Sequence, residues 1–177
     1  MQGRRPTPRH LENSMLNNLT YLYGFNLGFA HRLVRDLSDE QMTAQPAGVI
    51  NHPAWSLGHL AVAADHLGMA LGLESHLPEG WDETFKTGGE PSGDASAFPT
   101  KEEIIGELEA QHARNTEAVQ NFDVARFAEE HPNEGTRKYF PTLGDQIIFM
   151  MTSHEMDHLG QIAAWRRAMG LGAATSA

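Results

Sequence analysis

Near the end of the chain, two histidines lie four residues apart in the segment SHEMDHLGQ, residues 153–161. His154, Glu155 and His158 match the H-E-x-x-H pattern of metalloproteases, in which two zinc ligands are one helical turn apart and the glutamate is the general base. The same two imidazoles can also bind a metal for different chemistry. Residues elsewhere in the chain distinguish these alternatives.

A metalloprotease needs a third ligand, and the residues after the pair do not supply one. One class has a third histidine six residues after the second, within H-x-x-G-x-x-H, where this chain has Gln161 and Ala164. The other class takes an acidic ligand from a later helix, but no Asp, Glu or His follows His158. We therefore interpret the protease match as a coincidence of spacing, and we expect Glu155 to lie one residue round the helix from the ligand face.

Both histidines lie on the apolar face of the same predicted helix. The apolar residues at helical spacing on this face are Ile147, Met151, Ile162 and Trp165. Two imidazoles about 6 Å apart on such a face are not easily charged together, whereas a metal binds both as neutral donors. His154 and His158 are therefore predicted to bind a metal, and the third ligand must come from upstream.

Several upstream histidines are candidates for the third ligand. His52, His59 and His66 are spaced by seven residues, which is about 10.5 Å along a helix, so at most one of them can join the pair. His112 is an alternative on periodicity alone. For His52 and His66 we favour capping or polar-face roles. The remaining histidines are interpreted as solvated: His10, His31, His76 and His131.

Four segments with helical periodicity predict an all-α fold, a four-helix bundle in which sites form between facing helices. They cover residues 13–37, 51–72, 100–122 and 142–170. Asn51, Thr100 and Thr142 are the expected N-caps of the last three segments, and Gly170 ends the final one. Sustained alternation of polar and apolar residues is lacking, so we expect negligible sheet.

Two connections in this bundle are long. Residues 73–100 contain the aromatics Trp81, Phe85 and Phe98, and loops of this length are often lids or binding segments. The alternative is a surface excursion whose aromatics attach it to the bundle. Residues 130–141 form a similar, shorter connection. A short helical turn is expected at residues 38–41, where Ser and Gln have the spacing of a capping box.

Composition limits the partners and the compartment. The chain has 177 residues, which we expect to form one domain with flexible tails at 1–10 and 171–177. Its net charge of −10 argues against nucleic acid as a partner, and no apolar run approaches the roughly 18 residues that cross a membrane. Without cysteine there is no disulfide, thiolate ligand or cysteine nucleophile. We expect a cytoplasmic protein that acts on a small-molecule substrate.

Two motifs together resemble the DinB-like superfamily of small four-helix-bundle proteins. They are N-x-x-x-W-x-x-G-H-L at residues 51–60 and H-x-x-x-H-L-G-Q at residues 154–161, and the resemblance extends from about residue 11 to 169. It implies that His59 joins His154 and His158 as ligands of one divalent metal. Gln161 also fits the family's pattern. A homodimer is a further expectation from this resemblance.

The better-understood relatives in this family are mycothiol-dependent isomerases and bacillithiol-type S-transferases. The resemblance therefore implies a metal-dependent enzyme that activates a low-molecular-weight thiol for transfer to a small electrophile. Because the chain has no cysteine, that thiol must be a cosubstrate. Zn or Ni is the first expectation for the metal, with Fe, Cu and Mn as alternatives.

Two other functions remain open from the residues alone. The first is a metal-dependent hydrolase in which Glu155 or Asp157 accepts the proton. The second is a non-catalytic, metal-stabilised bundle that serves as a stress or interaction module. An open, aromatic-lined cavity beside the metal ligands would favour an enzyme, whereas a sealed core would favour the module.

Overall fold

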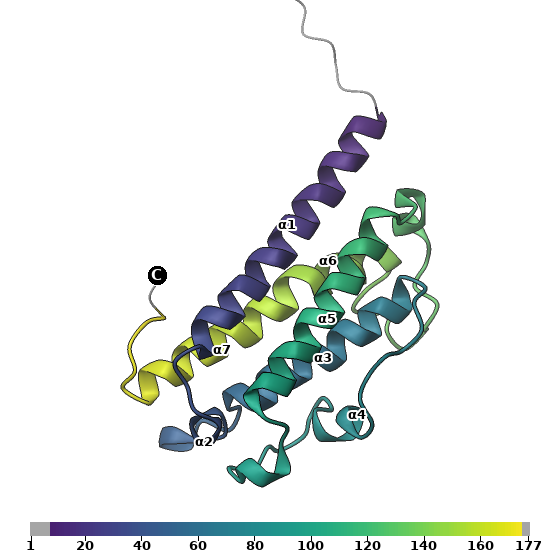
Figure 1. The fold of residues 1–177 in the computed structure, drawn as a ribbon. Helices are drawn as coiled ribbons and strands as arrows, with labels where there is room; N and C mark the ends of the chain where they lie inside the picture. Colours follow the sequence, from purple (N-terminus) through teal and green to yellow (C-terminus); the bar gives the residue numbers. More distant parts are fainter. Residues whose placement is uncertain (1–7, 175–177) are drawn as a thin grey trace, which may run out of the picture.

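The computed structural model describes residues 8–174, and its side chains from residue 14 onward. The long helical segments run alongside one another as a bundle (Figure 1). They are α1 (Pro8–Val34), α3 (Pro53–Ala70), α5 (Lys101–Gln120), and a last helix composed of α6 (Leu143–Phe149), the π-helical segment η4 (Met150–His154) and α7 (Glu155–Ala168). The shorter elements are α2 (Asp39–Met42), η1 (Pro46–Gly48), α4 (Trp81–Thr84), η2 (Ala95–Ala97) and η3 (Val124–Ala128).

The all-α prediction is confirmed for the part of the chain that is described. No strand occurs within residues 8–174, where Glu130 and Thr142 form only an isolated antiparallel bridge. No helix within the same residues is long and apolar enough to cross a bilayer. The expected tails fall mostly on residues 1–7 and 175–177, which lie outside the described residues, as does the side chain of His10.

Local capping signals explain where most of these helices begin. Ser38, Thr100 and Thr142 each accept from a backbone N–H one turn ahead, in capping boxes completed by the side chains of Gln41, Glu103 and Asp145. For α3 the predicted cap is wrong by one residue. Its N-cap is His52, whose Nδ1 accepts from the Trp55 N–H at 3.1 Å, with Pro53 in the first turn.

The α3 helix is the central helix of the bundle. Nearly all of its side chains are buried, because α5, α7 and residues 73–100 surround it. Small residues such as Ala61 and Ala64 keep its surface flat enough for these neighbours to approach closely. A helix that is apolar on all sides is stable only as a core element. Functional side chains on α3 are therefore held in a rigid, dry environment.

The last helix is not regular throughout, although its sequence predicts one uninterrupted helix. The segment η4 is π-helical, which widens the turn and leaves backbone carbonyls without their usual donors. The buried side chain of Asn26 on α1 donates from Nδ2 to the carbonyls of Met151 (3.4 Å) and Thr152 (3.3 Å). Contacts from α1 therefore stabilise the wide turn that precedes the paired histidines.

Residues 73–100 are bonded to the bundle along their length. Near the start of this segment, Asp65 on α3 accepts from the Ser75 hydroxyl (2.7 Å) and the His76 N–H (2.8 Å). Further on, Nε2 of His52 donates to the Ser92 carbonyl at 3.0 Å. Phe85 is fully buried between these anchors. The segment forms a wall against α3, which agrees with the expectation that its aromatics attach it to the bundle.

Candidate metal centre

Three imidazoles from three elements meet inside the bundle. His59 comes from α3, His154 from η4 and His158 from α7, and one nitrogen of each lies within 4.8 Å of the others. His59 Nε2 and His154 Nε2 are 3.3 Å apart. His154 and His158 are one turn apart on the last helix, so they face α3 together. The structure thus brings together the three residues implied by the family resemblance.

A backbone carbonyl sets the orientation of His59. Its Nδ1 lies 2.8 Å from the carbonyl oxygen of Phe85. Because a carbonyl only accepts, Nδ1 carries the proton and Nε2 keeps its lone pair, which points at the other two rings. Trp55 stacks on a face of the His59 ring, with ring centroids 5.1 Å apart and planes inclined by 6°. The loop and the helix together hold this imidazole in the tautomer that a metal ligand requires.

Gly58 makes that contact with Phe85 feasible. A Cβ atom on residue 58 would lie 2.2 Å from Cε1 of Phe85, far inside contact distance. Any side chain there would displace the Phe85 ring, and with it the carbonyl that holds His59. The glycine is therefore a packing requirement of the site, at a helical position where its conformational freedom is not needed.

The electrostatic environment keeps all three imidazoles neutral. Burial, together with a smaller contribution from the neighbouring histidines, lowers the pKa of His154 and of His158 to about 4, while Asp157 opposes the change. Burial also lowers the pKa of His59. At neutral pH the cluster therefore presents nitrogen lone pairs with no proton to displace. Three neutral imidazoles are a donor set that fits a divalent cation such as zinc and leaves coordination positions open.

The cluster borders a cavity of about 470 Å³. His59 and His154 form part of its wall, and the apolar remainder comes from Val62, Ala63, Phe85, Phe140, Phe149 and Met150. The exposed residues His66, Asp82, Lys86 and Thr87 complete the lining. This volume is within the usual range for small-molecule sites, about 300–1,000 Å³. His59 and His154 are therefore accessible to a ligand from the cavity.

A comparison with known protein families agrees with this arrangement. The sequence model of the DinB superfamily matches residues 30–162, which include all three histidines. This chain belongs to the DinB superfamily. A search of curated proteins found no match. Membership accounts for the bundle and for the histidine positions, but family membership alone does not assign a reaction to this DinB-superfamily protein.

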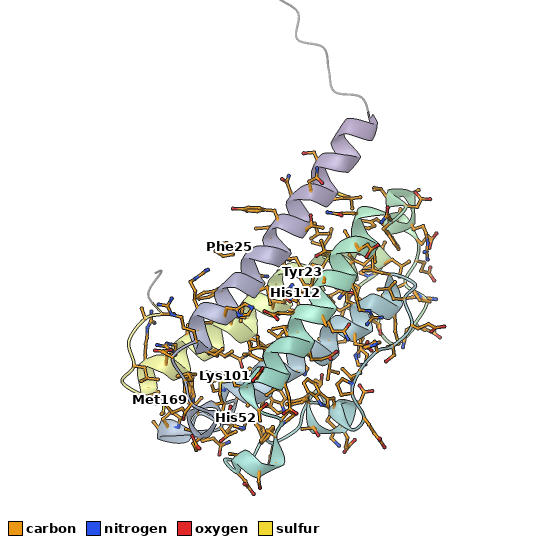
Figure 2. All side chains as sticks on the ribbon, in the orientation of Figure 1. Tyr23, Phe25, His52, Lys101, His112 and Met169 are labelled. Atoms are coloured by element: carbon orange, nitrogen blue, oxygen red, sulfur yellow. The ribbon has the colours of Figure 1, made fainter. Side chains whose placement is uncertain are left out.

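Glu155 does not face the histidine cluster of this DinB-superfamily protein. Its Oε1 accepts from Nε2 of His112 at 2.7 Å, and both side chains are buried. His112 in turn stacks on Tyr23, with centroids 3.6 Å apart and planes inclined by 9° (Figure 2). Burial raises the pKa of Glu155, and its bond to His112 opposes that rise. His112 therefore does not join the three imidazoles. Glu155 points away from them, as expected from its position one residue round the helix, so it is not placed to act as a general base at the cluster.

The side chains of four further histidines have partners, whereas His76 is exposed, as expected. His52 is a cap, as expected, and His66 lies on the exposed side of α3 beside Asp82. His31 pairs with Glu109 at 3.0 Å. The prediction that His131 is solvated is wrong. It is 5% exposed, and its Nε2 donates to the Gln146 side chain at 2.8 Å.

Sequence reasoning missed several residues that shape the cavity. Phe140 comes from the connection of residues 130–141, which gave little indication of a role, and Phe149 precedes the π-helical segment. Their ring centroids are 5.0 Å apart, and Phe149 lies 5.7 Å from the ring of His154. The aromatic residues close to the H-x-x-x-H motif were the available signal, but only packing shows that they face the same cavity.

Proposed function

We propose that this DinB-superfamily protein binds a divalent cation through His59, His154 and His158 and transfers a low-molecular-weight thiol to a small electrophile. The observation that carries the proposal is the meeting of three neutral imidazoles, two of which line an aromatic-lined cavity. A bound cation would lower the pKa of a coordinated thiol from its solution value near 8.5. The chain has no cysteine, so the thiol enters as a cosubstrate.

The chain's own residues bind and orient the reactants. The Phe85 carbonyl and the Trp55 ring keep the lone pair of His59 directed at the cluster. The apolar walls of the cavity hold the electrophile and exclude water from the reacting atoms. The loop at residues 73–100 contributes Phe85 to both tasks, because the Phe85 carbonyl orients His59 and the Phe85 ring lines the cavity. The proposed division of roles therefore needs no large conformational change.

The hydrolase alternative is less well supported by the geometry. It requires a carboxylate near the cluster to accept a proton from water. Glu155 is 3% exposed and bonded to His112. Asp157 lines a different groove, between α1 and α7, together with Leu22 and Asn26. Neither carboxylate lines the cavity that contains His59 and His154, and the carboxylate that does, Asp82, is exposed and paired with His66.

The non-catalytic alternative is likewise less well supported. A purely structural metal site is usually closed, with every coordination position filled by protein. Here no acidic or further histidine ligand joins the three imidazoles within the described residues. The cavity beside them supports a site that exchanges small molecules with solvent.

The experiment combines metal loading with a thiol panel. Metal-free protein is loaded with Zn²⁺ or Ni²⁺ and assayed with glutathione, bacillithiol and mycothiol against 1-chloro-2,4-dinitrobenzene. We expect metal-dependent transfer with at least one thiol, and loss of transfer in His154→Ala. His31→Ala, which removes a histidine on α1 remote from the cluster, is the matched control. Equal rates for the loaded protein and His154→Ala would exclude the proposal.

Two further expectations from the sequence remain proposals. We propose a homodimer, which light scattering at micromolar concentration tests directly, because a monomer mass contradicts it. A cytoplasmic location is the second, and it is consistent with a chain that contains no cysteine.

A further inference from the structure

The cavity beside the histidine cluster is lined by several aromatic rings, which are tilted relative to one another. Phe140 and Phe149 come from different segments and pack with ring centroids 5.0 Å apart, and His154 continues the row at 5.7 Å from Phe149. Val62 and Ala63 on α3 also line the cavity. Aromatic rings prefer offset or edge-on contacts with one another over face-to-face stacking, so tilted rings such as these can contact the faces and edges of a further ring. A space of about 470 Å³ lined by aromatic and aliphatic side chains favours an apolar body that contains a ring.

The charged groups at the mouth are already paired. Nε2 of His66 lies 3.2 Å from Oδ1 of Asp82, and the Lys86 ammonium forms an ion pair with Glu83. Lys86 is the one permanent cation among the described residues that line this cavity. An anionic ligand would compete with Glu83 for Lys86 and would approach Asp82, within a chain whose net charge is −10. In the metal-free protein the mouth therefore selects against negative charge.

We infer that this cavity binds an uncharged molecule built on an aromatic or conjugated ring, with a polar atom that meets His66 or Thr87 at the mouth. The inference rests on the proposed function only in taking this cavity as the substrate site. His66 and Thr87 are exposed, whereas Phe85 and Ala63 are buried. The lining thus changes from apolar at the histidine cluster to polar at the solvent side, and it orients a ligand that is polar at one end.

Binding can be measured without any reaction. Metal-free, ¹⁵N-labelled protein is titrated with 4-nitroanisole and, in parallel, with 4-nitrobenzoate, which has the same ring and a negative charge. We expect 4-nitroanisole to shift the amide resonances of residues 62–63, 85–87 and 149–150. We expect 4-nitrobenzoate to bind at least about tenfold more weakly, because like charges repel at the mouth. Equal or tighter binding of the benzoate would overturn the inference.

Variants test the wall and the mouth separately. Phe149→Ala should weaken 4-nitroanisole binding several-fold, whereas Phe25→Ala, which removes an exposed phenylalanine of α1 (Figure 2), should not change it. Asp82→Asn combined with Glu83→Gln should reduce the preference for the neutral probe. If Phe149→Ala loses its fold, Ala63→Leu, which fills the same cavity, provides the second test. Unchanged affinity in a folded wall variant would overturn the inference.

Failure of this inference and failure of the proposed function give different results. Binding of 4-nitroanisole in the cavity without any thiol transfer contradicts the proposed function alone. Metal-dependent thiol transfer by a protein whose metal-free cavity binds 4-nitrobenzoate as tightly as 4-nitroanisole contradicts the ligand preference alone.

Discussion

Asn26 of α1 donates from its side-chain amide to the backbone carbonyl of Thr152, at 3.3 Å, inside the π-helical segment that ends at His154. A second bond reaches the carbonyl of Met151. These carbonyls belong to a widened turn, where the helix does not fully satisfy them. A side chain from one helix thereby stabilises the backbone shape that orients a candidate ligand on another.

Asn26→Leu nearly keeps the size of the side chain but removes the amide group that donates to the carbonyls of Met151 and Thr152. We expect the free energy of unfolding to fall by about 1–3 kcal/mol, because buried carbonyls lose their partners. We also expect metal affinity to fall by about tenfold or more, because a relaxed turn reorients His154. Titration with Co²⁺, followed by its visible absorption, measures the affinity. Asn18→Leu, at an exposed position of the same helix, is the control. Wild-type Co²⁺ affinity and spectrum in Asn26→Leu would show that the contact does not position the site.

Gly58→Ala tests the contact between α3 and the loop. The added Cβ would meet the Phe85 ring at 2.2 Å, so the ring and its carbonyl must move away from His59. We expect a loss of about 1–3 kcal/mol in unfolding free energy, as for overpacked cores, together with weaker metal binding. Gly160→Ala on α7, where no atom lies within 4 Å, is the matched control. It should be neutral or stabilising by up to about 1 kcal/mol, since alanine is the better helix former. Similar urea midpoints for the two variants would contradict this account.

The metal-free protein should lose stability as the pH falls below 6.5. The pKa of His154 and of His158 is lowered from 6.5 to about 4, mainly by burial. The unfolded chain therefore takes up protons that the folded protein does not bind until about pH 4. The free energy of unfolding therefore has its full value, as far as these two histidines are concerned, above pH 6.5. It falls as the pH drops toward 4, by about 1–2 kcal/mol for each histidine after allowance for solvent screening.

Urea unfolding at pH 7 and pH 5 measures this dependence. A variant with both His154→Gln and His158→Gln removes the two titrating groups, so its stability should change less between the two pH values. An equally steep loss in the double variant would assign the pH dependence to other groups.

Glu155 distinguishes thiol transfer from hydrolysis. In Glu155→Gln the amide oxygen can still accept from His112, so we expect thiol transfer to remain nearly intact. Glu155→Leu leaves the buried His112 without its acceptor, and it should lower the unfolding free energy by about 1–3 kcal/mol. Thermal unfolding and the thiol assay measure the two effects. Loss of activity in a stable, metal-loaded Glu155→Gln protein would instead support hydrolysis with this carboxylate as base.

Much of the fold follows from local chemistry that the sequence displays directly. Ser38, Thr100 and Thr142 cap the helices that their side chains predict, because a cap needs only residues within one turn. The same holds for the paired histidines, since residues four apart always share a helical face. The all-α class and the position of His154 and His158 beside each other were therefore predictable without coordinates.

Tertiary packing decided which upstream histidine meets this pair. His59 and His112 both lie on buried helix faces, so periodicity cannot separate them. Contact between α3 and the last helix brings His59 to His154, while His112 on α5 meets Glu155 instead. The π-helical turn, the Phe85 carbonyl on His59 and the Phe140 ring in the cavity also depend on partners distant in sequence. A sequence pattern reports the residues that share one face of one element, but only the packing of elements determines which faces meet.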